Sequence, residues 1–150
     1  MKKFKFSLET VLSYKQQVLD VLQGEHAAIL AQVHQQEEFL TACWQQYRDC
    51  SAEYNRRSET GLLITDAMIY QSELRAMERQ IQQETDRLEQ LQAQAEEKRM
   101  EVVEAKKDTS SIEKLREKKL AAYDKAVAKS EEQLIEEFVS TARAMEAAGA

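Results

Sequence analysis

One chain-reversal signal, in residues 58–70, constrains the fold of this sequence more than any other feature. The chain has no proline among its 150 residues and only three glycines, so few tight turns are available. Gly61 follows a helical run and is suited to the left-handed conformation that ends a helix. Thr65 is placed to cap a following helix, with Ile64 and Ile69 spaced as a hydrophobic staple across that cap. The segment therefore predicts a helix, a turn and a second helix.

Two rows of mostly apolar residues with a seven-residue repeat precede the turn. One row is Leu12, Leu19, His26, Val33, Leu40, Tyr47 and Tyr54, and the other is Leu8, Lys15, Leu22, Ile29, Gln36, Cys43 and Cys50. A repeat sustained over this length is typical of a coiled-coil seam. We expect helix 1 to cover about residues 7–58, with Ser7 as its cap.

A second pair of rows follows the turn, in a helix expected over about residues 66–146. These rows are Ala67, Leu74, Ile81, Leu88, Ala95, Val102, Thr109 and Tyr70, Met77, Glu84, Leu91, Lys98, Ala105, Ile112. Folding back through a turn at about 59–65 places Tyr54 opposite Tyr70, Leu22 opposite Val102 and His26 opposite Lys98. The sequence thus predicts an all-α fold of a single domain, an antiparallel two-helix coiled-coil hairpin.

The apolar repeat of helix 2 falters near residues 108–112. Ser110 and Glu113 have capping-box spacing, which is compatible with a kink or a helix restart there. Beyond this point an apolar stripe continues, although helix 1 has no residues left to pair with it. We therefore expect helix 2 to overhang helix 1 by about thirty residues, or about 45 Å. Such a stripe is seldom left in water.

Composition excludes several classes of function. The net charge of −6 argues against a general nucleic-acid binder, and no run approaches the about 20 apolar residues of a membrane span. Cys43 and Cys50 match no zinc spacing with the two histidines. Phosphate loops, nucleophile elbows and paired catalytic carboxylates are also absent. We expect a cytoplasmic protein that is not an enzyme and uses no metal or cofactor.

Large side chains gather near the predicted hairpin end. They are Phe39, Leu40, Trp44, Tyr47, Tyr54, Tyr70, Leu74, Met77 and Ile81. Phe39 and Trp44 flank the seam, so part of their surface should stay open once the helices pair. Two interpretations remain: a wide seam that uses bulky flanking residues as core, or a docking patch, since aromatic and methionine surface is enriched at binding hot spots.

The two ends of the chain carry a family resemblance. The opening Phe4-Lys5-Phe6-Ser7-Leu8-Glu9-Thr10-Val11-Leu12-Ser13-Tyr14-Lys15 resembles the start of the flagellar export protein FliJ family. Similar too are the segment Ile69-Tyr70-Gln71 and the tail segments 112–119, 131–133 and 136–137. The resemblance covers nearly the full chain.

This resemblance implies a stalk-like component of the flagellar type III export apparatus, needed for flagellum biogenesis and motility. Family members are similar to the central stalk of rotary ATPases; they bind a hexameric export ATPase, promote its assembly and activity, and link it to the export-gate membrane protein. An escort role for export chaperones is also implied. Such a protein would lie in the cytoplasm at the flagellar base, with no nucleic-acid partner and no insertion into the membrane.

The expected partner surfaces follow from combining these arguments. For the ATPase we expect the tail residues Leu115, Leu120, Tyr123, Val127, Leu134 and Phe138. For the export gate we expect Phe39, Leu40, Trp44, Tyr47, Tyr70, Leu74 and Met77 near the hairpin end. The alternatives are a scaffold coiled coil that dimerises through its C-terminal tail and, disfavoured by the acidic charge, a helical arm that binds nucleic acid.

Overall fold

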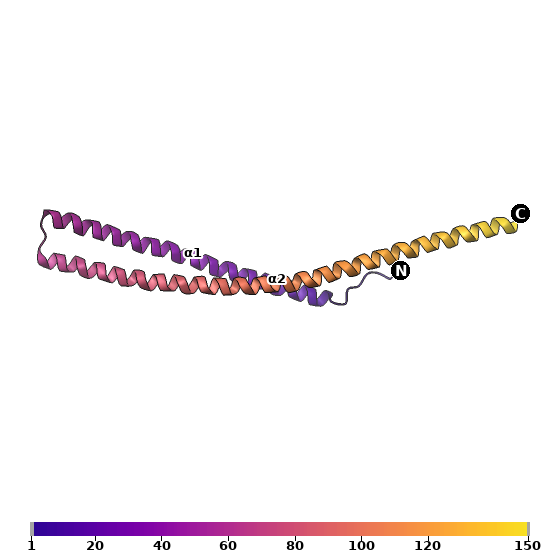
Figure 1. Cartoon of the computed structure of the whole chain (residues 1–150), viewed down its shortest axis with the longest axis horizontal. Helices are drawn as coiled ribbons and strands as arrows, with labels where there is room; N and C mark the ends of the chain where they lie inside the picture. Colours follow the sequence, from indigo (N-terminus) through magenta and orange to yellow (C-terminus); the bar gives the residue numbers. More distant parts are fainter. Residues whose placement is uncertain (1, 150) are drawn as a thin grey trace. The chain divides into compact units, whose positions relative to one another are not determined.

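The computed structural model describes residues 2–149 and contains two helices, α1 (Glu9–Thr60) and α2 (Ile64–Gly149), joined by residues 61–63 (Figure 1). The chain divides into two compact units. The hairpin unit is Asp20–Val103, and the terminal unit is Met1–Leu19 with Glu104–Ala150. Within each unit α1 packs on α2, and in the terminal unit α2 continues beyond the start of α1. The predicted all-α hairpin with an overhanging second helix is confirmed.

The turn confirms the role of Gly61 and corrects the cap that follows it. Gly61 has φ of 101°, a left-handed conformation that strains any residue with a Cβ atom. The first helical bond of α2 runs from the Ala67 N–H to the Leu63 carbonyl, at 2.9 Å, so Leu63, and not Thr65, holds the capping position. The staple prediction is wrong as well, because the early start of α2 leaves Ile64 and Ile69 79% and 57% exposed.

The start of α1 differs from the expected cap in a similar way. The Leu12 N–H donates to the Leu8 carbonyl at 2.8 Å, which places Leu8 rather than Ser7 at the capping position. The preceding backbone already turns, with the Glu9 N–H donating to the Phe6 carbonyl at 3.1 Å. Glu9 lies in the first turn of α1, where its negative charge complements the helix dipole.

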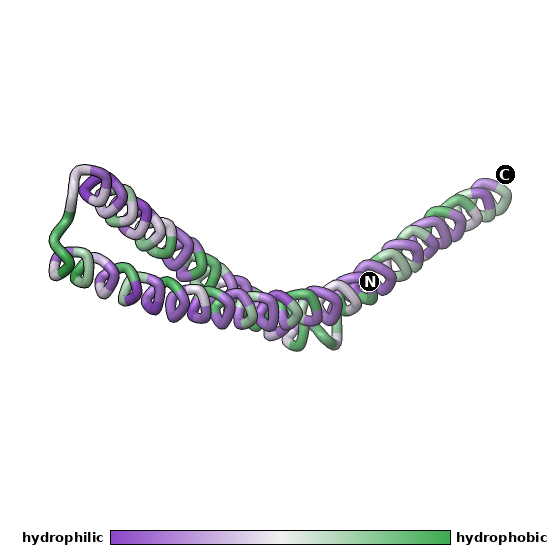
Figure 2. Tube along the Cα trace, turned by 60° about the vertical axis from the view of Figure 1, so that its left-hand side comes forward, coloured by the Kyte–Doolittle hydropathy of each residue, from purple (hydrophilic) through white to green (hydrophobic). Residues whose placement is uncertain are grey.

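The seam forms where the two seven-residue repeats predict it. All 14 predicted seam positions before the turn and all 14 after it are buried or half-buried, and apolar residues recur along both helices between polar ones (Figure 2). In the hairpin unit Cys43, Ile81 and Ala95 are the most buried apolar residues. The rings of Tyr54 and Tyr70 lie 5.5 Å apart, so this predicted layer is confirmed.

Polar seam residues are satisfied by partners on the opposite helix. The Gln36 amide is 8% exposed and donates to the Glu84 carbonyl at 3.0 Å and to the Glu84 carboxylate. The Lys98 ammonium contacts Glu25 and Glu101 at 2.8 Å each, so it pairs with the neighbour of His26 in α1. Hydrogen bonds from Lys98 to Glu101 and Glu25 raise the pKa of this lysine. These pairs allow charged and amide groups to lie in a narrow seam.

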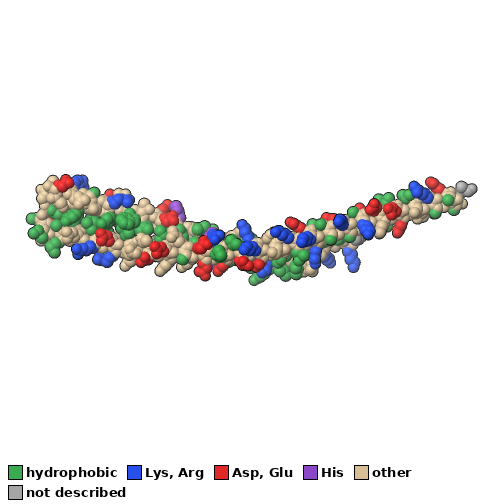
Figure 3. Space-filling view, in the orientation of Figure 1, with side chains coloured by type: hydrophobic (Ala, Val, Ile, Leu, Met, Phe, Trp, Pro, Cys, Tyr) green, Lys and Arg blue, Asp and Glu red, His purple; other side chains and the backbone are tan. Residues whose placement is uncertain are grey.

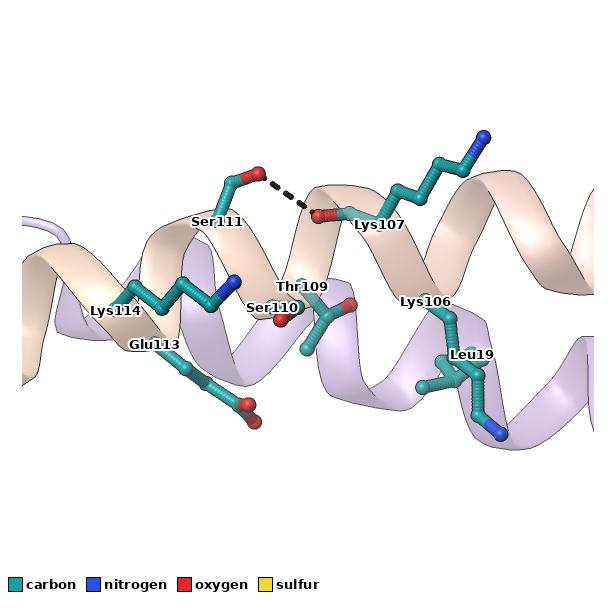
Figure 4. A pocket seen from close by; sticks show the side chains of 8 residues that line it. All are labelled: Leu19, Lys106, Lys107, Thr109, Ser110, Ser111, Glu113 and Lys114. Carbon is teal, nitrogen blue, oxygen red and sulfur yellow. Dashed lines mark hydrogen bonds between the residues drawn. The ribbon is translucent and has the colours of Figure 1, made fainter.

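The predicted interruption near residues 108–112 does not break α2, which is helical from Ile64 to Gly149. Thr109 is 3% exposed and its hydroxyl donates to the Ala105 carbonyl at 2.8 Å. The Ser111 hydroxyl donates to the Lys107 carbonyl at 2.9 Å (Figure 4). Because hydroxyls in a helix can bond to the carbonyl four residues earlier, these residues are accommodated without a new cap.

We expect an engineered disulfide to report the register of the hairpin unit. With Cys43 and Cys50 replaced by alanine, the pair Leu22→Cys and Val102→Cys should oxidise rapidly within one chain, since the seam places these positions in one layer. Mobility on non-reducing gels and the mass of the oxidised chain would measure this. The pair Leu22→Cys and Ala95→Cys, one heptad away, is the control. Equal rates for both pairs would contradict the register.

We expect the Gln36–Glu84 pair to contribute more to the specificity of helix pairing than to the free energy of unfolding. Gln36→Leu alone should lower the free energy of unfolding by about 1–3 kcal/mol, because a half-buried carboxylate loses its donor. Adding Glu84→Leu should recover most of that loss, since a well-packed apolar layer replaces a buried polar pair at little cost. Urea unfolding followed by circular dichroism measures both values. A double variant that is less stable than the single one would show that the pair is a net stabiliser.

Candidate partner-binding surfaces

The hairpin-end residues predicted from the sequence separate into seam and surface. Phe39 and Trp44 are 46% and 43% exposed, as their flanking positions predict. The others are half-buried members of the seam, namely Leu40, Tyr47, Tyr70, Leu74 and Met77. Hydrophobic side chains from both helices are visible on the face of the hairpin unit in Figure 3. The structure therefore leaves an aromatic surface that rests on the seam.

Trp44 is held on this surface by Tyr47. Their ring centroids lie 5.9 Å apart with the planes at 88°, an edge-to-face geometry that aromatic pairs prefer. The Tyr47 hydroxyl donates to the Glu78 carboxylate at 3.0 Å. This hydrogen bond favours the neutral phenol and raises the pKa of Tyr47. The indole is therefore placed by a side chain that is itself fixed between α1 and α2.

Tyr70 is fixed by a second polar network nearer the turn. The Arg57 guanidinium donates to the Tyr70 hydroxyl at 2.8 Å and lies 5.6 Å from the ring centroid. The Tyr70 hydroxyl in turn donates to the Glu53 carboxylate at 3.3 Å. With Tyr54 against its ring, Tyr70 is a structural residue of the hairpin end. Tyr70 is half-buried, so only part of its surface is available to a partner.

Sequence reasoning missed an exposed aliphatic cluster at the turn itself. Leu63, Ile64, Met68 and Ile69 are 71%, 79%, 63% and 57% exposed. Four large apolar side chains in and just after a three-residue connection have no partner helix to cover them. The run Leu62-Leu63-Ile64 is the signal that could have indicated this cluster, because apolar runs are uncommon in polar turns.

The predicted tail residues fall into two groups. Leu120, Tyr123 and Val127 are half-buried, and Leu115 is 38% exposed. Leu134 and Phe138 are 63% and 76% exposed. Three further apolar side chains of the same stretch were not among the predicted site residues: Ile135, Val139 and Met145, at 65%, 41% and 72% exposed. Every residue from 131 to 149 is exposed, so this stretch of α2 carries the open apolar surface.

The segment before α1 explains why some tail residues are half-buried and others exposed. The sequence did not reveal this role of the segment. Phe6 is 7% exposed, and Phe4 packs on Tyr123 with ring centroids 5.6 Å apart. The Tyr123 hydroxyl donates to the Lys2 carbonyl, and the Arg116 guanidinium lies 5.7 Å from the Phe4 ring centroid. The first residues thus cover part of α2 that α1 does not reach. The alternation of apolar and basic residues in Phe4-Lys5-Phe6 is the signal that could have indicated an extended segment.

The described residues present surfaces rather than an enclosed site. Residues 2–149 contain no group of three or more side chains that could hold a metal ion. No helix in this range is long and apolar enough to cross a membrane. Two open hollows lie in the terminal unit, one beside Leu19 and Thr109 (Figure 4) and one between Lys3 and Tyr123. Such an arrangement can bind macromolecules through its helix faces.

Comparison with known proteins gives one family. The family described as flagellar FliJ protein matches residues 4–146. This range includes α1, the turn and nearly all of α2, together with the hairpin-end and tail residues discussed above. No curated protein and no solved structure matches the chain.

We expect Trp44 to contribute less to stability than Met77. Met77→Ala should lower the free energy of unfolding by about 2 kcal/mol, because it removes a side chain from the seam. Trp44→Ala should lower it by about 1 kcal/mol, since much of the indole is already in water. Urea unfolding of both variants measures the difference. In the wild-type chain acrylamide should quench the single tryptophan readily; a blue-shifted, shielded indole would contradict a surface position.

Proposed function

Because the chain belongs to the flagellar FliJ protein family, whose members are components of the flagellar export apparatus, we propose that it is a stalk-like regulator of the export ATPase. It binds the ATPase hexamer through the tail of α2 and promotes assembly and activity of the ring. It acts in the cytoplasm at the base of the flagellum. Membership of the family supports the assignment to the export apparatus. The exposed surfaces of the chain support the individual contacts.

The observation that carries this proposal is the open apolar stripe of the tail. Leu134 and Phe138 lie four residues apart on one face of α2 and are 63% and 76% exposed. Neither α1 nor the segment before it covers residues 131–149, all of which are exposed. A helix with one apolar face fits a groove in a partner. A single helix end is also narrow enough to enter the centre of a ring.

The hairpin end is proposed as the contact to the export gate. Trp44 and Phe39 supply exposed aromatic surface on a fixed base, and such residues dominate binding energy at interfaces. The exposed apolar side chains at the turn give the hairpin unit a second apolar surface, which was not expected from the sequence. With the ATPase at the tail and the gate at the hairpin end, the chain links the two. An escort role for export chaperones uses the same exposed faces.

We expect Leu134→Glu with Phe138→Glu to abolish stimulation of the export ATPase while leaving the chain folded. Both side chains are exposed, so the unfolding midpoint should move little. Phosphate release by the purified ATPase, titrated with wild-type or variant chain, measures the stimulation.

The matched control is Gln133→Glu with Ser140→Glu, which adds the same charge to the opposite face of this helix stretch. It should stimulate like the wild type. Equal loss in both variants would assign the effect to charge alone, and full stimulation by the Leu134/Phe138 variant would remove the tail from the ATPase contact. A large drop in the unfolding midpoint would show that the tail is part of the fold.

A further inference from the structure

The segment before α1 builds a groove on the terminal unit, and the lysines around this groove have no role in the proposed function. The groove is an open hollow of about 990 Å³ lined by Lys2, Lys3, Phe4, Lys5, Lys119, Ala122 and Tyr123. Phe4 and Tyr123 form an aromatic floor, with ring centroids 5.6 Å apart. Lysines from the N-terminal segment and from α2 surround it. An apolar floor with a cationic rim fits a ligand that is both apolar and acidic.

The groove lies in the basic part of an acidic chain. Residues 2–19 and 104–130 carry 12 Lys and Arg against 6 Asp and Glu. The hairpin unit carries 8 against 16, and residues 131–149 carry 1 against 5. In the terminal unit Lys15 pairs with Asp108 and Arg116 with Glu9. Within residues 2–149 no ion pair involves Lys2, Lys3, Lys5 or Lys119.

This charge distribution disfavours an extended polyanion as the occupant. A nucleic acid or an anionic membrane presents negative charge over a long distance, whereas the basic stretch of α2 is followed directly by Glu131, Glu132, Glu136 and Glu137. These carboxylates would repel the same polyanion that the lysines attract. A short acidic helix avoids this repulsion. Figure 3 shows Lys and Arg gathered along one part of α2 and acidic side chains beyond it.

The chain itself contains a segment with the required chemistry. In residues 131–149 the exposed Leu134 and Phe138 form an apolar stripe, and helical periodicity places Glu131 and Glu137 on either side of it. The segment cannot return to its own groove, because it continues α2 and each residue lies about 1.5 Å farther along the axis. Only another molecule can bring this tail to the groove.

We infer that two copies of this chain associate reciprocally, with the acidic tail of each copy lying in the lysine-rimmed groove of the other. The stripe covers Phe4 and Tyr123 of the partner copy, while Glu131 and Glu137 meet its lysines. Both contacts are identical, so the pair closes with two-fold symmetry. This association goes beyond the proposed function and uses the tail surface proposed for the ATPase, so the two partners compete for it.

Sedimentation equilibrium of the chain alone tests the inference. At 50 mM salt the mass should rise with concentration from the 17.3 kDa of one chain towards twice that value. At 500 mM salt the dissociation constant should rise by about tenfold or more, because charge pairs at a surface are screened. A chain that stays monomeric at about 1 mM in low salt would overturn the inference.

Charge reversal identifies the contact. A groove variant, Lys5→Glu with Lys119→Glu, and a tail variant, Glu131→Lys with Glu137→Lys, should each be monomeric, because like charges then meet at both contacts. Mixing the two variants should restore the dimer, since the reversed groove meets the reversed tail and the natural groove meets the natural tail. This rescue also shows that both variants are folded. A mixture that stays monomeric would overturn the proposed contact.

A control variant on the far face of the tail tests whether net charge alone governs the association. Glu132→Lys with Glu136→Lys changes the charge equally on the face away from the stripe and should dimerise within about threefold of the wild type. Dimers that persist in both reversal variants would place the interface elsewhere and overturn the inference. So would a monomeric wild-type chain that binds RNA, or vesicles of anionic lipid at 150 mM salt, through Lys5 and Lys119.

Discussion

The structure depends on the packing of two seven-residue repeats against each other. Most of the stability of helices in proteins comes from burying an apolar face, and the apolar rows of α1 and α2 are buried only when both helices meet in one register. The most buried apolar residues of the hairpin unit, Cys43, Ile81 and Ala95, lie in this seam. The turn at Gly61 allows the two helices to pack together, and the paired helices carry the aromatic and charged surfaces.

The seam could be predicted from the sequence because it depends on periodicity alone. Every one of the 28 predicted positions is buried or half-buried, including the polar Lys15, His26, Gln36, Glu84 and Lys98. Cap assignments were less successful, since Thr65 and Ser7 are good capping residues by type but lie beside the positions where the helices begin. Helix ends depend on small local energies that tertiary packing overrides.

The candidate surfaces were predicted only in part, for a similar reason. Exposure of Phe39, Trp44, Leu134 and Phe138 follows from their positions relative to the two rows. The packing of Phe4 on Tyr123 joins residues more than a hundred positions apart through an extended segment, and no repeat connects them. The groove beside that contact therefore emerged only from the structure, whereas the stripe it is inferred to receive was visible in the sequence.

The narrow seam affects how the chain unfolds under force or heat. No described side chain is less than 2% exposed, so there is no dry centre whose loss would collapse everything at once. Each layer contacts only the layers before and after it, so the stability of the hairpin is approximately a sum of contacts between neighbouring layers. Layers at an end can separate and close again while the rest stays paired. A short length of either helix can thus separate from the other and bind a partner while the rest of the chain stays folded.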